Sequence, residues 1–228
     1  MSKKNALKEL AEPDYLSKVF DEMYAKSNRR KREREDRYGI SLELFKKNKN
    51  DFIRKLSSSL KEKRYIFRNL EPYFLIKPNG KERIICSSSI KDKLVQKSVL
   101  KLLNERGYSF GNAVNFGFIK DKDKTVEKAL AKALKFRENK RWAYKTDITA
   151  FFDKIDRNIL KIKAKNKIRV KSLHDLIFQM INCEIHCENK ALKEKIKNAG
   201  IQYGLGLRQG MPISPYLSNR DVLTLQNN

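Results

Sequence analysis

The stretch AYKTDITAFFDKID, from Ala143 to Asp156, decides how the rest of the chain is interpreted. Before Asp147 the residues alternate with the period of a β-strand, from Trp142 onward, which puts the Asp147 carboxylate at the strand's far end. A carboxylate buried beside aromatics must be neutralised or bind a cation. Mg²⁺ prefers one or two carboxylates together with substrate phosphates, so Asp147 is a candidate ligand for phosphoryl transfer. Taken alone the signal is weak, because aspartate at a strand end is also a common turn former.

A second motif, GLGLRQGMPISPYLSN, runs from Gly204 to Asn219. Its three glycines let the backbone approach a ligand closely, and Ser214 followed by Pro215 predicts a helix start with Ser214 as its cap. Backbone amides at a helix start attract phosphate. A tight turn before a helix explains the same residues equally well.

The composition favours a nucleic-acid partner. Lys and Arg number 52 against 27 Asp and Glu, a formal charge of +25 spread over the whole chain, and such an excess favours a polyanion. Codon bias toward lysine in an A/T-rich genome would explain part of it. Three cysteines, an odd number, argue against a disulfide framework and suit a reducing compartment. No stretch approaches 18 uncharged apolar residues, so we expect a soluble, cytoplasmic protein without a membrane span.

Hydrophobic periodicity predicts an α+β fold, rich in helices and with a small antiparallel sheet. A hairpin is expected where two short apolar runs flank Pro78, Asn79 and Gly80. A glycine C-cap at Gly107 ends one of the expected helices. The expected helices cover about 14–24, 51–60, 90–107, 125–136, 156–162, 172–181 and a segment starting at Ser214.

Two basic segments are candidate nucleic-acid contacts. Residues 26–37 hold seven basic and three acidic side chains with almost nothing apolar, so they are either simply solvated or bound to phosphate. Residues 154–171 hold eight basic and one acidic side chain. We expect Ile159 and Ile162 to pack inward there and leave a cationic outer face for a duplex. The candidate contacts are Arg29, Arg30, Arg32, Lys161, Lys163 and Lys165.

In this order, KTDITAFFDKID and GLRQGMPISPYLSN closely resemble two conserved blocks of the reverse transcriptase family, particularly its bacterial branch of group II intron, retron and antiviral enzymes. KERIICSSSIKDKLVQKSVLKLL is similar to the finger block of that family, and NFGFIKDKDKTVEKAL to the segment before its palm. The resemblance covers about Pro72 to Asn219. It implies a right-hand polymerase, with a basic helical extension at 1–50, fingers at 51–140 and a partial palm at 141–228.

The resemblance implies roles for three residues of the first motif. Asp147 is similar to the first metal-binding aspartate of the palm, where two Mg²⁺ ions act, and the backbone carbonyl of Ile148 is similar to a further ligand. Phe152 matches the aromatic residue that contacts the sugar of the incoming nucleotide and rejects a 2′-hydroxyl. A rigid ring suits that role, because it cannot yield to one extra oxygen.

The resemblance also implies a nucleotide pocket. Gln209 and Gly210 match residues that line this pocket and the templating base. Arg83, with Lys77 or Lys81, is similar to the fingers pair that grips the triphosphate, as a planar guanidinium can. A surface charge is the alternative interpretation of each basic residue.

The implied activity is RNA-directed DNA synthesis, in which dNTPs are added to a primer 3′ end on an RNA template by two-metal phosphoryl transfer. That chemistry needs several carboxylates to hold ions about 3.5–4 Å apart. The family takes the others from a Tyr-x-Asp-Asp hairpin downstream, and no adjacent Asp pair occurs in the 228 residues.

Three interpretations follow for a chain that ends before this hairpin. It is an inactive fragment without the second half of the palm and the thumb, or part of a split polymerase completed by a C-terminal partner that supplies the carboxylates. Alternatively, it is a non-catalytic, basic RNA-binding module of maturase type. Between a mobile element and phage defence, the sequence slightly favours defence, because no maturase or endonuclease segment is visible.

Overall fold

The structure is a computed structural model that describes residues 5–76, 78, 80, 82–108, 116–117 and 125–224, with side chains as far as Asn219. Within these residues it is helix-rich with one small antiparallel sheet, which confirms the predicted fold class. Its helices are α1 (Ala6–Leu10), α2 (Pro13–Ala25), α3 (Arg29–Glu33), α4 (Leu42–Lys47), α5 (Lys49–Lys61), α6 (Ile90–Glu105), α7 (Val126–Asn139), α8 (Phe151–Lys154), α9 (Arg157–Lys167), α10 (His174–Asn182), α11 (Lys190–Asn198) and α12 (Ser214–Thr224), with a 3-10 turn at Lys171–Leu173.

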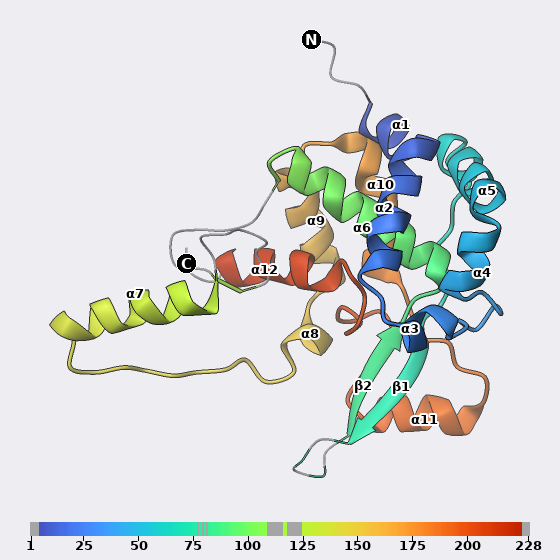
Figure 1. Ribbon diagram of the computed structural model, residues 1–228. Coiled ribbons are helices and arrows are strands. Elements are labelled where there is room, and N and C mark those ends of the chain that lie inside the picture. Colours follow the sequence, from blue (N-terminus) through green and yellow to red (C-terminus); the bar gives the residue numbers. More distant parts are fainter. Residues whose placement is uncertain are drawn as a thin grey trace.

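The main core forms where α2 packs against α5 and α6 (Figure 1). α2 buries Leu16, Val19, Phe20 and Met23, a spacing of three or four residues that puts all of them on one helical face. Phe20 stacks on Phe45 of α4 with ring centroids 4.5 Å apart. Helices α1, α2 and α4 therefore share one core with α5 and α6, while the domain boundaries at 50 and 140 stay predictions.

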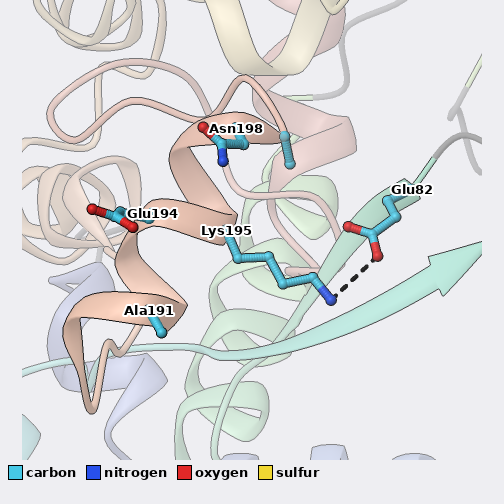
Figure 2. A pocket seen from close by; sticks show the side chains of 6 residues that line it. Glu82, Ala191, Glu194, Lys195 and Asn198 are labelled. Atoms are coloured by element: carbon cyan, nitrogen blue, oxygen red, sulfur yellow. Dashed lines mark ion pairs between the residues drawn. The ribbon is translucent and has the colours of Figure 1, made fainter.

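The predicted hairpin is confirmed as strands β1 (Glu71–Ile76) and β2 (Glu82–Ser87), which pair antiparallel with Tyr73 opposite Ile85. It projects from the helical body, and α11 lies alongside it (Figure 1). Lys195 of α11 forms an ion pair with Glu82 at 3.2 Å, beside a cavity of about 620 Å³ (Figure 2). The same ammonium lies 4.1 Å from the centre of the Phe74 ring. This contact with α11 is one of those that support the two-stranded hairpin.

Helix α9 begins as predicted. The Asp156 carboxylate caps it by accepting hydrogen bonds from the backbone amides of Asn158, at 2.7 Å, and Ile159, at 3.0 Å. The prediction for its inner face was wrong. Ile159 and Ile162 are 49 % and 60 % exposed, whereas Leu160 and Ala164 are fully buried. The buried face follows the period of three to four residues from Arg157 rather than the most apolar side chains.

The predicted strand before Asp147 is absent. Residues 142–148 form neither a helix nor a paired strand, and every residue from 141 to 150 is exposed. α7, which precedes them, buries no residue, and both segments project from the body (Figure 1). The physical reason is that a strand needs a neighbour for its backbone hydrogen bonds. β1 and β2 pair with each other, and no other strand lies within the described part of the chain.

No helix of the described residues is both long and apolar enough to cross a bilayer.

Candidate nucleotide and nucleic-acid site

Residues 204–210, the first part of the second motif, form a loop that contacts both the first motif and the hairpin. The amide of Leu207 donates to the carbonyl of Phe152 at 2.7 Å, and the amide of Gly206 donates to the carbonyl of Ile155 at 2.8 Å. At its other end, the carbonyl of Gln209 accepts from the amide of Cys86 in β2 at 2.6 Å. Backbone hydrogen bonds therefore hold this loop between residues 152–155 and the hairpin.

The glycines of the loop permit close approach, but to protein backbone instead of a ligand. A Cβ on Gly210, whose φ is +105°, would lie 2.3 Å from the carbonyl oxygen of Cys86. A Cβ on Gly206 would lie 2.6 Å from the carbonyl oxygen of Asp153. Gly204 has nothing within 4 Å of that position. Backbone of α8 and β2 therefore occupies the space beside Gly206 and Gly210, while the assignment of Gly210 to the nucleotide pocket stays a prediction.

The start of α12 at Ser214 is confirmed, but its environment is not the one expected. The Ser214 hydroxyl donates to the carbonyl of Arg208 at 2.8 Å. Ile213 and Ser214 have no exposed surface. These two residues therefore offer no surface to a phosphate.

Gln209 lies at the centre of the candidate site. Its side-chain oxygen accepts from Nε of Arg83 at 2.8 Å, and its side-chain nitrogen donates to a carboxylate oxygen of Asp153 at 3.3 Å. Two residues predicted from separate blocks, Gln209 and Arg83, are thus in direct contact. Sequence reasoning missed Asp153 as a site residue, and its place directly after Phe152 in the first motif is the signal that could have found it.

Phe152 is half-buried in α8, beside this cluster. Its ring packs edge-on against Phe151, with ring centroids 5.7 Å apart. The helix begins after Ala150, which has a positive φ of 53°, a conformation that costs an L-residue roughly 1–2 kcal/mol. This turn changes the chain direction between the exposed segment that holds Asp147 and the packed α8.

Asp147 and Ile148 lie on the exposed segment, and Ile148 is 46 % exposed. Within the described part of the chain, Asp147 has no hydrogen bond or ion pair. No group of three or more His, Cys, Asp or Glu side chains could hold a metal ion among those residues. The residues present therefore do not by themselves fit a magnesium site, and the positions of Asp147 as a catalytic residue and of Ile148 as a ligand stay predictions.

A buried network of three charged side chains, Glu184, Arg157 and Arg208, holds the 204–210 loop in place, and sequence reasoning missed it. Glu184 accepts from Arg157 at 2.5 Å, from Arg208 at 2.5 Å and from the amide of Gly204 at 2.8 Å. Arg157 also donates from Nε to the carbonyl of Gly206 at 2.8 Å. The side chains of Arg157, Arg208 and Glu184 are 5 %, 1 % and 11 % exposed.

This network has a defined electrostatic balance. Burial by itself would raise the pKa of Glu184, but the hydrogen bonds from Arg157 and Arg208 outweigh it and hold the pKa below its ordinary value of 4.5. Charges this deeply buried persist because they are paired and hydrogen-bonded. No motif contains all three residues, so only the folded chain reveals the network.

The predicted nucleic-acid contacts lie on two separate helices. On α3, Arg29 and Arg30 are exposed, and Arg29 pairs with Glu33 at 2.7 Å. Arg32 instead lies over the ring of Tyr24, 4.2 Å from its centre. Of the three predicted lysines on α9, Lys165 is exposed, whereas Lys161 and Lys163 are half-buried. Two further predicted residues, Lys77 and Lys81, lie outside the described residues.

Comparison with known proteins agrees with this arrangement. The family model for reverse transcriptase (RNA-dependent DNA polymerase) matches residues 75–227. A protein described as a COX1/OXI3 intron 1 protein of Saccharomyces cerevisiae is 25 % identical over 190 residues, which cover 83 % of this chain and 22 % of that protein. A solved Cas6-RT-Cas1–Cas2 complex matches with a TM-score of 0.55 at 18 % identity, over 99 % of this chain and 22 % of that one.

The chain thus spans about a fifth of the length of both proteins. The structural match concerns the fold alone, whereas the family model covers well over half of the chain and includes both motifs and most of the hairpin. From these blocks and their convergence in the fold, the chain belongs to the reverse transcriptase family.

Proposed function

We propose that the chain supplies the fingers and the first part of the palm of an RNA-directed DNA polymerase, which adds dNTPs to a primer 3′ end on an RNA template. One observation carries the proposal. Gln209 of the second motif bonds at once to Arg83 of the finger hairpin and to Asp153 of the first motif. Three segments that are far apart in the sequence and belong to separate family blocks converge there.

In this proposal the cluster around Gln209 forms one wall of the nucleotide pocket. Arg83 uses Nε to hold Gln209, which leaves its two terminal nitrogens for the triphosphate, a geometry that suits a guanidinium. Lys77 or Lys81 would add a second cation from the hairpin turn. Phe152 would contact the sugar from α8, beside the same cluster.

The metal chemistry requires more than the described residues provide. Two Mg²⁺ ions would need carboxylates in addition to Asp147, and we propose that further polypeptide supplies them and covers the segment 141–148. The exposure of that segment supports this idea, because Trp142 and Tyr144 are 94 % and 91 % exposed. Aromatic side chains of this size are usually packed against something. RNA would bind to the basic residues of α3 and α9.

The proposal is tested by nucleotide crosslinking. The chain is mixed with a poly(rA)·oligo(dT) primer–template and radiolabelled dTTP, irradiated and analysed on a denaturing gel. Gln209→Ala and Arg83→Ala should each reduce the crosslinked signal. Gln202→Ala should not, because Gln202 is an exposed glutamine of the same connection to α12. A signal that is equal in all variants overturns the proposed pocket.

A non-catalytic, basic RNA-binding module is the second candidate function. Asp147 is exposed, and the described residues contain no group of three or more side chains that could hold a metal ion; both observations favour this alternative. Such a module would bind the primer–template but would not crosslink dTTP above background. Primer extension with and without Mg²⁺ completes the comparison: incorporation by this chain that survives Asp147→Ala would show that the assignment of Asp147 is wrong.

A further inference from the structure

A cationic cavity, separate from the one beside α11, lies at the base of the hairpin, and Gln209 does not line it. It has a volume of about 400 Å³ and lies where residues 26–36, β1, β2 and the first half of α6 meet. This volume is within the range of pockets that bind small ligands. Its cationic lining comes from two places, α6 and the segment after α2, and consists of Lys26, Lys31, Arg34, Lys93 and Lys97.

Only three carboxylates line the cavity, and two of them already accept hydrogen bonds from the protein. Asp36 accepts from the backbone amides of Tyr38, Ile40 and Ile90, at 2.8 to 3.1 Å, and so holds its own loop against α6. Glu71 accepts from the hydroxyl of Tyr73 at 2.6 Å. The third is Glu35. Five cations against three carboxylates leave the cavity net positive.

Lys93 is the most informative of the five cations. It is half-buried, and its ammonium donates to the hydroxyl of Ser87 at 2.8 Å. Within the described part of the chain Lys93 has no ion pair, and the neutral hydroxyl of Ser87 is the one hydrogen-bond partner of its ammonium. Burial lowers the pKa of Lys93. A half-buried ammonium that donates to a hydroxyl keeps further N–H donors, and a bound anion would satisfy them.

We propose that this cavity binds a phosphate group of an RNA strand. The inference rests on the proposed RNA-binding function and adds a specific site to it. Phosphate matches the lining because it accepts several charge-assisted hydrogen bonds at once. Ser87 and Arg83 are four residues apart on β2, which puts this site about 14 Å along the strand from the candidate nucleotide pocket. One hairpin would therefore contact the nucleotide near its turn and the RNA strand at its base.

The test compares Lys93→Met with Lys8→Met by fluorescence anisotropy of a fluorescein-labelled RNA 12-mer, between 50 and 200 mM salt. Methionine keeps the apolar stem of lysine and removes the charge. Lys8 is an exposed lysine of α1, which lies at the opposite end of α2 from α3 (Figure 1). Lys93→Met should reduce the slope of log affinity against log salt by about 0.7, the value for one phosphate contact to a single strand, and Lys8→Met should not. Circular dichroism checks the fold, and Lys97→Met is a second variant in the same cavity.

Labelling of the wild-type chain gives an independent measurement. The chain is treated briefly with acetic anhydride, with and without RNA, and acetylation is quantified at Lys93 and Lys8 by mass spectrometry. RNA should protect Lys93 more than Lys8. RNA with a 5′-phosphate and RNA with a 5′-hydroxyl are compared, because protection by both identifies a backbone phosphate and protection by the first alone identifies a terminal one.

The outcomes separate this inference from the proposed function. If the wild-type chain binds RNA but Lys93→Met behaves as Lys8→Met does and RNA leaves Lys93 unprotected, the phosphate site is overturned and the RNA-binding function stands. If the wild-type chain does not bind RNA, both are overturned.

Discussion

Glu184→Gln should destabilise the chain far more than an ordinary surface substitution. Glu184 accepts hydrogen bonds from two guanidinium groups and one backbone amide, and the side chains of Arg157 and Arg208 are at most 5 % exposed. Glutamine removes the charge and puts an N–H₂ donor against one of these cations. Removing one partner of a buried ion pair typically costs about 3–5 kcal/mol, because the remaining charge stays buried without compensation.

Urea unfolding followed by far-UV circular dichroism measures this loss. With a slope of about 3 kcal/mol/M, at the upper end for small proteins, the midpoint should fall by about 1–2 M. Glu188→Gln is the matched control, because Glu188 pairs with Arg37 at 2.9 Å but its side chain is 60 % exposed. Such an exposed pair contributes about 0–1 kcal/mol. If the two variants lose the same free energy of unfolding, the reasoning about the buried network is refuted.

The difference in stability between the wild-type chain and Glu184→Gln should depend on pH. Because the folded pKa of Glu184 is held below its ordinary value of 4.5, its contribution to stability is fully present above that value. The contribution is lost as the pH falls through the lower folded pKa, where the carboxyl becomes neutral as glutamine is. The difference in unfolding free energy between wild type and Glu184→Gln should therefore be constant from about pH 8 to pH 5 and shrink below that. A difference that grows on acidification would contradict this assignment.

Three further predictions concern local structure. Gly210→Ala should destabilise the chain by more than the roughly 1–2 kcal/mol of a positive φ, because its Cβ would meet a backbone carbonyl at 2.3 Å, whereas Gly200→Ala, with φ +86° and nothing within 4 Å, should lose only that amount in urea unfolding. Asp156→Ala should lower the unfolding free energy by about 0.5–2 kcal/mol, measured in the same assay, because it removes the cap of α9. Ellman's reagent at pH 8 should modify Cys187 rapidly and the two buried cysteines only after denaturation, since burial raises the pKa of both thiols to about 12.

Each of these has an outcome that would contradict it. Equal losses for the two glycine substitutions would mean that the loop does not approach β2 as closely as described. An unchanged unfolding midpoint for Asp156→Ala would remove the capping interaction. Rapid modification of all three thiols in the folded chain would show that the core around β2 and residue 183 is open.

The sequence predicted the local elements well, because their signals lie within a few residues. The apolar period of α2, the Pro78–Gly80 turn of the hairpin and the aspartate cap of α9 each predicted an element that the structure confirms. It failed where an element depends on a partner elsewhere. The strand before Asp147 has the right alternation, but within the described residues no second strand lies beside it to accept its hydrogen bonds.

By itself, the sequence determined the family and the residue types of the candidate site, since both motifs and their order are written in the chain. The tertiary structure decided which of those residues meet. It put Gln209 between Arg83 and Asp153, brought Gly206 and Gly210 against protein backbone, and paired Glu184 with two buried arginines. The physical reason is that hydrogen bonds and buried charges are settled by distance in space, and residues separated by up to 126 positions in the sequence carry no local signal that they will be neighbours.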